Sequence, residues 1–396
     1  MTWSMSITAP TVLRHSHLGL LSGCPLCKLR PELLMATTPK HRGQRRTSAE
    51  SKSGESDRGV VSTIPHRIDV HHHIIPPRFI PEMGMSWVNR HNEPLPLHQP
   101  FQWTPAMSIE EMDKNGVATG MTSVSDPGVW NGDVDKSRAM MRYCNEYGAD
   151  LVRDHKGRFG MFATLALPDV DGCLREIEYA LDDLKADGFV LMTSYDNKWP
   201  GDAAFAPVLD ELNRRKAVVY VHPTAPARCE SLIPDVADAV VEFLFDTVRA
   251  VTSLLFSGTF SRCSDIKFIF SHAGSAVPLL AARIARLSRI TPSVNARLPH
   301  GATHELKKLF YEIAQQASPE GLAPLMTLAT FDRIMFGSDF PWAPPGMMAQ
   351  TIAGLNAYGF KPSELQAIER GNALRLFPRF VTPTDRLNNS TRQSSH

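Results

Sequence analysis

The segment Asp69-Val70-His71-His72-His73 carries three neighbouring histidines at the end of a short apolar run. Side chains alternate along a β-strand, so His71 and His73 lie on one side, and two imidazoles on one face make half of a metal site. A register slip of one residue would present His72 instead and lose the pair. We therefore predict that His71 and His73 bind a metal ion and that His72 does not.

Three more polar residues stand at the same relative place, just after later apolar runs: His222, His272 and Asp339. One histidine after a strand is usually a satisfied polar residue, but five such residues at equivalent positions indicate a shared site. A mononuclear zinc or manganese centre with one open position needs neutral imidazoles and a carboxylate. The residues that supply this set are His71, His73, His222 and Asp339.

These residues must be held by elements that end at one common edge. Short runs rich in β-branched residues alternate with amphipathic helical stretches, which is typical of βα units and a parallel sheet. The runs, eight in number, are Arg67 to His71, Gly120 to Ser125, Gly160 to Leu167, Gly188 to Thr193, Ala217 to His222, Ile266 to Ser271, Leu309 to Ala314 and Arg333 to Gly337. They predict an α/β fold, a (β/α)8 TIM-type barrel whose active groups lie at the carboxyl ends of the strands.

Helices are predicted between the strands. Their ranges are Val134 to His155, Leu174 to Leu184, Ala203 to Arg215, Asp235 to Phe260, Ala276 to Ile290, Pro319 to Ala329 and Met347 to Tyr358, with one more at Ser363 to Phe377. Asp171, Ser318 and Ser363 are positioned as N-caps. The insertion after the first strand, Ile74 to Ala106, is too long for a plain turn, so we expect it to fold over the barrel mouth.

Composition and charge exclude several classes of function. Residues 1–66 carry nine Lys and Arg against four Asp and Glu and show little periodicity, so we expect a disordered extension, with a mitochondrial transit peptide as the alternative. We expect residues 381–396 to be a flexible tail. The barrel at 67–380 is mildly acidic, which argues against nucleic-acid binding. No apolar run is long enough to cross a membrane, and six scattered cysteines fit a reducing, cytoplasmic location.

The motifs around these residues resemble those of a known family. Four segments are similar to motifs of the metal-dependent amidohydrolase superfamily: Asp69 to His73, Val221-His222-Pro223, Ser271-His272-Ala273-Gly274 and Phe336 to Trp342. A fifth segment, Gly371 to Phe377, resembles the closing helix of that superfamily. Within it, the chain looks like the decarboxylase branch that includes aminocarboxymuconate-semialdehyde decarboxylase. Val190 to Trp199 and Leu212 to Lys216 are similar to fungal 6-methylsalicylate decarboxylases. Resorcylate-type decarboxylases usually begin with Glu-x-His, where this chain has His71-x-His73, so that subgroup matches less well.

The resemblance implies a metal-dependent, non-oxidative decarboxylase of a small aromatic acid. The expected reaction converts 6-methylsalicylate to 3-methylphenol and carbon dioxide in polyketide secondary metabolism. One divalent ion per subunit, zinc in preference to manganese and without an organic cofactor, would fix the substrate's carboxylate and phenol oxygen. Asp339 would bind the ion or deliver the proton, and His272 would orient or deprotonate a water molecule or share in the proton relay.

Three further residues are predicted to bind the substrate. By the same resemblance, Arg283 would reach the site of the neighbouring subunit in a homodimer, or it is a solvated helix arginine beside Arg286 and Arg289. Trp199 and Trp342 follow strand ends, where they either stack on an aromatic ring or pack against the protein.

Two alternative functions would use the same residues. The barrel could hydrolyse a lactone or an amide with His272 or Asp339 as the base, or it could be an inactive barrel that serves as a binding partner. The complete metal set disfavours the inactive barrel. Gly274 and Gly337 lie beside the site, where they allow close approach of the backbone or form ordinary turns.

Overall fold

The computed structural model describes residues 66–84, 103–226, 228–230, 232–343, 346–383 and 385–386. The predictions for residues 1–65 and 387–396 lie outside these ranges, as does most of the insertion after the first strand. The described start of that insertion contains the short helix α1 (Phe79–Met83).

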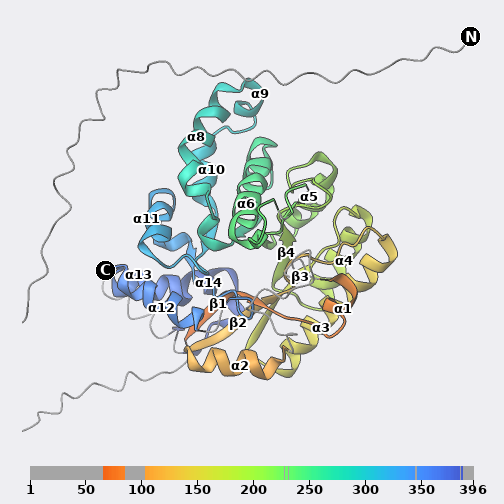
Figure 1. The fold of residues 1–396 in the computed structure, drawn as a ribbon, viewed down its shortest axis with the longest axis vertical. Coiled ribbons are helices and arrows are strands. Elements are labelled where there is room, and N and C mark those ends of the chain that lie inside the picture. Colours follow the sequence, from red (N-terminus) through yellow and green to blue (C-terminus); the bar gives the residue numbers. More distant parts are fainter. Residues whose placement is uncertain are drawn as a thin grey trace, which may run out of the picture. The chain divides into compact units, whose positions relative to one another are not determined.

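Eight parallel strands form the barrel, and each is hydrogen-bonded to the next in chain order (Figure 1). The strands are β1 (Arg67–His73), β2 (Val117–Ser123), β3 (Phe159–Thr164), β4 (Gly188–Met192), β5 (Val218–His222), β6 (Lys267–Phe270), β7 (Phe310–Glu312) and β8 (Ile334–Met335). The predicted (β/α)8 fold is therefore confirmed, with each observed strand in or beside its predicted run.

Backbone hydrogen bonds between β1 and the residues that directly follow β8 close the barrel. The Val70 N–H donates to the Phe336 carbonyl at 3.0 Å, and the Asp339 N–H donates to the His71 carbonyl at 2.8 Å. His72 and Phe340 form a further parallel bridge. The seam of the barrel thus runs through the residues that the sequence marks for chemistry.

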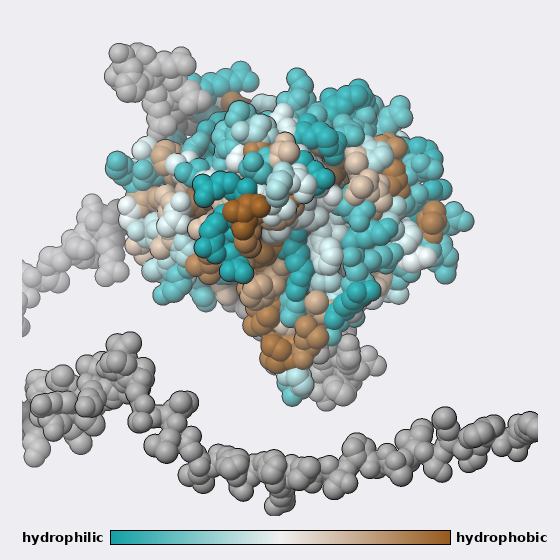
Figure 2. All heavy atoms as spheres, turned by 90° about the horizontal axis from the view of Figure 1, so that it is seen from above, coloured by the Kyte–Doolittle hydropathy of each residue, from teal (hydrophilic) through white to brown (hydrophobic). Residues whose placement is uncertain are grey.

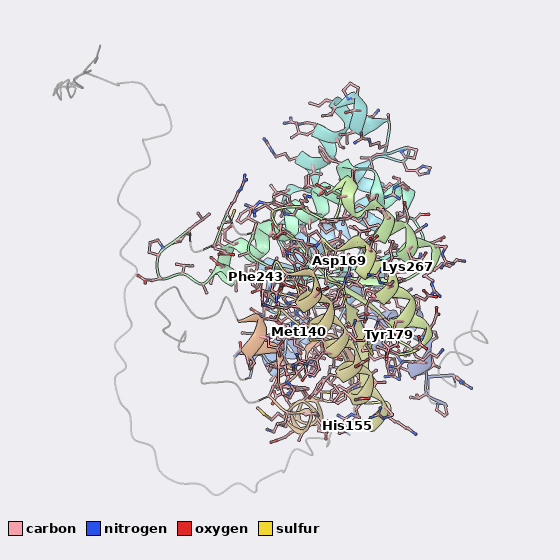
Figure 3. All side chains as sticks on the ribbon, turned by 90° about the vertical axis from the view of Figure 1, so that its right-hand side faces the viewer. Met140, His155, Asp169, Tyr179, Phe243 and Lys267 are labelled. Carbon is pink, nitrogen blue, oxygen red and sulfur yellow. The ribbon has the colours of Figure 1, made fainter. Side chains whose placement is uncertain are left out.

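Helices cover the outside of the strands (Figure 1). The longer ones are α2 (Pro105–Lys114), α3 (Val134–Asp154), α4 (Val170–Asp182), α5 (Ala206–Arg214), α6 (Asp238–Phe256), α8 (Val277–Ile290), α10 (Ala302–Lys308), α11 (Pro319–Leu328) and α12 (Met347–Ala357). The short ones are α7 (Thr259–Arg262), α9 (Pro292–Asn295), α13 (Pro362–Gln366) and α14 (Asn372–Leu376). In Figure 3, Phe243 of α6 is labelled on the left and Lys267, at the start of β6, on the right. None of the described helices is long and apolar enough to cross a membrane.

Several helix boundaries differ from those predicted. Ser318 caps α11 as expected, accepting the Gly321 N–H at 3.3 Å. The cap assigned to Asp171 is wrong, because α4 begins earlier and the Asp169 carboxylate accepts the Gly172 N–H instead. Asp235 lies outside α6 because its φ of 62° is not helical.

The predicted closing helix is divided. Ser363 is not its cap, because α13 begins one residue earlier, and a π-helical turn (Ala367–Gly371) separates α13 from α14. The Asn372 side-chain amide donates to the carbonyls of Phe331 at 2.7 Å and Ile334 at 2.6 Å. The Phe336 N–H donates to the Ile368 carbonyl at 3.0 Å. These bonds hold β8 in place beside the site.

The barrel interior is filled by large aromatic rings below the chemical residues. Tyr220 is completely buried, and its ring stacks on that of Phe162 at 5.5 Å between centroids. The His71 ring makes an edge contact with the Tyr220 ring, with 5.2 Å between centroids. The interior is therefore a packed core that forms the floor of the site.

Candidate metal centre

His71, His73, His222 and Asp339 come together at the carboxyl ends of β1, β5 and β8, as the sequence predicted they should. One nitrogen or oxygen atom from each lies within 4.8 Å of all the others, and all four residues are buried. The Nε2 atoms of His71 and His73 are 2.9 Å apart. Asp339 Oδ1 lies 3.0 Å from the first nitrogen and 3.1 Å from the second.

This donor set fits a divalent ion. Bonds of about 2.0 to 2.2 Å from zinc to nitrogen and oxygen ligands place neighbouring ligand atoms roughly 3 Å apart, which matches the separations within the His71, His73 and Asp339 triangle. Three imidazoles and one carboxylate also suit manganese. The four residues can therefore hold one divalent ion.

His72 points away from this group. Its Nδ1 lies 2.9 Å from Asp69 Oδ2, and its Nε2 lies 2.9 Å from Ser108 Oγ. The Asp69 carboxylate also accepts the Ser338 N–H at 2.9 Å. His72 and Asp69 thus fasten the closing seam of the barrel beside the site.

Burial, which disfavours charge, is the largest single influence on the pKa values of the four residues. For His71 the charges of Asp339 and Glu312 outweigh burial and raise the pKa of the imidazole to about 10. The charge of His71 and hydrogen bonds from the histidines hold the pKa of the Asp339 carboxyl well below its usual range. Burial lowers the pKa values of His73 and His222. A divalent ion on His71 Nε2 would supply the positive charge that a proton otherwise supplies there.

Glu312, at the end of β7, is a site residue that the sequence argument missed. Its carboxylate is completely buried, accepts the His272 N–H at 2.8 Å and lies 2.8 Å from His71 Nδ1. Burial is the largest influence and opposes the charge of Glu312, but the charge and hydrogen bond of His71, with the charge of His272 and the Ala314 N–H, together outweigh it and lower the pKa of Glu312. A carboxylate on Nδ1 leaves Nε2 free to bind an ion and fixes the ring. A lone acid in the apolar run 309–314 was the available signal.

Gly337 makes room for this carboxylate. A Cβ atom at position 337 would lie 2.0 Å from Glu312 Oε2 and 3.0 Å from the His71 Cβ. Of the two roles that the sequence allows for Gly337, a close approach of the backbone or an ordinary turn, the structure shows the close approach.

His272 lies on the other side of Asp339. Its Nε2 is 3.4 Å from Asp339 Oδ2, and its Nδ1 is buried without a hydrogen bond among the described residues. The same Oδ2 accepts a hydrogen bond from the Gln315 side chain at 2.6 Å. His272, Gln315 and Asp339 all have positive φ values, of 52°, 56° and 63°. Such strain collects at functional sites, where the surroundings impose it.

The three predicted substrate-binding residues lie in different settings. The Trp199 indole N–H donates to Asp246 Oδ1 at 2.7 Å, so this tryptophan is held against α6. Trp342 is only 4% exposed and belongs to the apolar core. Arg283 is exposed on α8. The Trp342 backbone N–H donates to the carbonyl of the ligand Asp339 at 2.9 Å. None of these contacts shows a substrate role, so the substrate roles of all three residues stay predictions.

Similarity to known proteins agrees with this geometry. A family profile described as Amidohydrolase matches residues 68–379. Decarboxylase yanB of Aspergillus niger is 34% identical over 334 residues, which are 81% of this chain and 89% of the relative. The 6-methylsalicylic acid decarboxylase of Penicillium expansum is 33% identical over 318 residues, which are 79% of this chain and 96% of the relative.

A solved structure has the same fold. It is a dihydroxybenzoic acid decarboxylase from Polaromonas sp. JS666 with bound manganese and the inhibitor 2-nitroresorcinol. The TM-score is 0.68 at 20% identity, and the match covers 80% of this chain and 98% of that one.

Proposed function

Because this chain belongs to the amidohydrolase family, we propose that it is a metal-dependent decarboxylase of a small aromatic acid. Relatives named decarboxylases, at 32% to 34% identity over about four fifths of the chain, support this reaction. The proposed substrate is 6-methylsalicylate, which would give 3-methylphenol and carbon dioxide as a step of polyketide metabolism, and two of these relatives are named for that acid.

The observation that carries the proposal is the placement of His272 and Asp339. These two residues are 7% and 5% exposed, whereas His71 and His73 are completely buried, so the pair faces the mouth side of the centre. A divalent ion held by the four ligands would fix the substrate's carboxylate and phenol oxygens and offset their charge. Zinc is our first choice, and the manganese in the Polaromonas structure makes it the alternative.

Decarboxylation needs a proton on the ring carbon that bears the carboxylate. The carbon–carbon bond then breaks, carbon dioxide leaves, and the electron pair of that bond restores the aromatic ring. Because the pKa of Asp339 is held low, its carboxylate would have to receive the proton once the substrate is bound. His272 Nε2 lies 3.4 Å from Asp339 Oδ2, so the two atoms form a pair that can relay this proton to the ring. Both residues are fixed by their neighbours, so the proton donor and the substrate can be held in one geometry.

The test is a product assay on the metal-loaded protein. We expect 6-methylsalicylate to yield equal amounts of 3-methylphenol and carbon dioxide, and the Asp339→Asn variant to lose at least about 100-fold in kcat, in line with general acid catalysis. The matched control is Asp332→Asn, an acid whose side chain is 38% exposed and which lies outside the site. Turnover of lactones or amides without carbon dioxide release would favour the hydrolase alternative.

We also propose a homodimer, with α6 and α8 at its interface. Large apolar side chains are exposed on the segment before α6 and on both helices: Leu232, Ile233, Val236, Val240, Phe245 and Leu279. Figure 2 shows brown, hydrophobic atoms gathered at the bottom edge of this view of the molecule. Exposed apolar patches on a folded protein commonly mark interaction surfaces. Arg283 lies on the same helix as Leu279, so this interface would bring Arg283 towards the partner.

Disrupting this face should yield monomers. Phe245→Glu places a charge where the proposed interface is apolar, and light scattering should report half the mass of the wild type. The control is Val134→Glu on α3, which is 41% exposed and lies outside the face. A wild type that is already monomeric would contradict the proposal.

A cytoplasmic location also stays a proposal. The described cysteines are free thiols, namely Cys144, Cys173, Cys229 and Cys263.

A further inference from the structure

Strand β7 contributes no ligand to the described metal group, yet its end controls the surroundings of that group. Glu312 closes the strand and holds His71 and the His272 backbone. The other oxygen of the same carboxylate accepts the Ala314 N–H at 2.6 Å. The chain therefore turns immediately after β7, beside the site.

This turn places Gln315 in a conformation that side chains rarely adopt. The Gln316 N–H donates to the Ile313 carbonyl at 3.0 Å, and Gln315 has a φ of 56°. Left-handed φ values are unfavourable for a residue with a Cβ atom, and glutamine lacks the short side chain that helps Asn and Asp adopt them. The conformation is thus imposed by the turn that Glu312 holds.

The Gln315 side chain returns to the metal group although the residue is exposed. Its Nε2 donates to Asp339 Oδ2 at 2.6 Å. Asp339 Oδ1, in contrast, lies 3.0 Å and 3.1 Å from the Nε2 atoms of His71 and His73. The two oxygens of Asp339 therefore have different partners, with Oδ1 turned to the histidine pair and Oδ2 to Gln315 and His272.

We infer that Gln315 is a positioning residue that makes Asp339 a ligand through one oxygen only. Its amide holds Oδ2 out of the ion's reach, which keeps a position beside the ion open and leaves Oδ2 next to His272. The inference rests on the metal centre of the proposed function but not on the reaction catalysed. It therefore stands even if the substrate is a lactone.

Two substitutions separate this role from a structural one. Gln315→Leu removes the amide and keeps the backbone strain, whereas Gln315→Gly removes the amide and relieves the strain. We expect the glycine variant to unfold at the wild-type temperature or above it. In both variants, the visible absorption of bound Co²⁺ should change, because its intensity depends on the number of ligand atoms. Both should also bind Zn²⁺ about tenfold more weakly in competition with a chelator.

The matched control is Gln316→Leu, which alters the neighbouring glutamine of the same turn and should leave the Co²⁺ spectrum and the affinity unchanged. Wild-type spectra and affinities in both Gln315 variants would overturn the inference, as would a Gln316→Leu variant with the same changes. If Gln315→Gly restored a wild-type spectrum that Gln315→Leu had lost, the residue would act through strain alone, which also contradicts it. Metal binding is measured without substrate, so a failed decarboxylase assay does not affect this test.

Discussion

His71 is the residue at which protons and metal ions compete. Its imidazole lies between two carboxylates, with Nδ1 on Glu312 and Nε2 on Asp339. The negative charges of these partners favour either a proton or a cation on the ring. Because Nδ1 is occupied by Glu312, both competitors must act at Nε2.

This competition predicts a pH dependence of metal binding. The carboxylates raise the pKa of His71 to about 10, so at neutral pH an ion must displace one proton. The apparent affinity should therefore fall about tenfold for each unit of decreasing pH between roughly 9 and 7, or about 1.4 kcal/mol per unit. Chelator competition measures the affinity, and calorimetry in two buffers should show about one proton released per ion. An affinity independent of pH would contradict the prediction.

Glu312→Gln should weaken the centre without unfolding the barrel. The amide keeps one oxygen that can accept a hydrogen bond, but its NH2 group cannot accept one. One of the N–H groups that now bond the carboxylate would therefore face another donor, and His71 would lose its fixed orientation. Partners of this kind are worth roughly 10-fold to 100-fold in metal affinity. The control is Glu305→Gln, an acid of α10 that is 1% exposed and bonds Ser261 and Lys308 instead. Equal metal affinity in the two variants would contradict this prediction, because it would show that neutralising any buried acid has the same effect on metal binding.

At the level of elements, strands β7 and β8 are short, with three and two residues, and the residues at and after their ends form contacts in the site. β8 spans two residues because the Phe336 N–H donates to the Ile368 carbonyl, outside the strand ladder. Gly337 then passes against the Glu312 carboxylate. The chain reaches Asp339 by a route that only a residue without a side chain permits at position 337.

Gly337→Ala should therefore be one of the most damaging small changes in the barrel. Its Cβ would lie 2.0 Å from Glu312 Oε2, so the carboxylate must move away from His71. We expect a loss of about 3 kcal/mol in unfolding free energy together with weaker metal binding. Gly371→Ala is the control, because its backbone is helical and no atom lies closer than 3.6 Å. That variant should gain about 0.5 kcal/mol by helix propensity, and denaturant unfolding compares the two.

The sequence predicts the strands well and the contacts between them poorly. Each strand is a mostly buried run, so its presence is visible locally, and the alternation in β1 identifies His71 and His73. Glu312 could not be assigned in this way, because its partner His71 lies 241 residues away. Trp199 shows the same limit, since its hydrogen bond to Asp246 depends on how α6 packs. Local patterns thus indicate the ligands, and only tertiary structure shows what holds them.

At the scale of the whole barrel, Arg370 ties the two ends of the described chain together. Its guanidinium donates to the His66 carbonyl at 2.9 Å, just before β1, and to both oxygens of Asp385, at 2.8 Å and 2.6 Å. Burial opposes the charge of Asp385, but hydrogen bonds from Arg370 and Thr382 outweigh it and lower the pKa of Asp385 from 3.8 to about 2.

The Arg370–Asp385 pair predicts that the free energy of unfolding depends on pH in the acid range. A carboxyl whose pKa is lower in the folded chain stabilises it above the unfolded pKa of 3.8 and loses this effect as the pH falls through about 2. The contribution is about 2 kcal/mol at pH values well above 4. Asp385→Asn should therefore be less stable than the wild type at neutral pH, and the difference should narrow towards pH 2. Denaturant unfolding at several pH values checks this, and a constant difference would contradict it.

The seam between β8 and β1 also fixes when the centre can form during biosynthesis. His73 and Asp339 are 266 residues apart, so the ribosome releases the first two histidines long before the carboxylate that faces them. A chain that ends before residue 339 has three ligands but lacks the seam bond from the Asp339 N–H to the His71 carbonyl. A complete set of ligands is therefore available only after residue 339 has been synthesised. Chains truncated before residue 339 should therefore bind the ion more weakly than chains that contain Asp339.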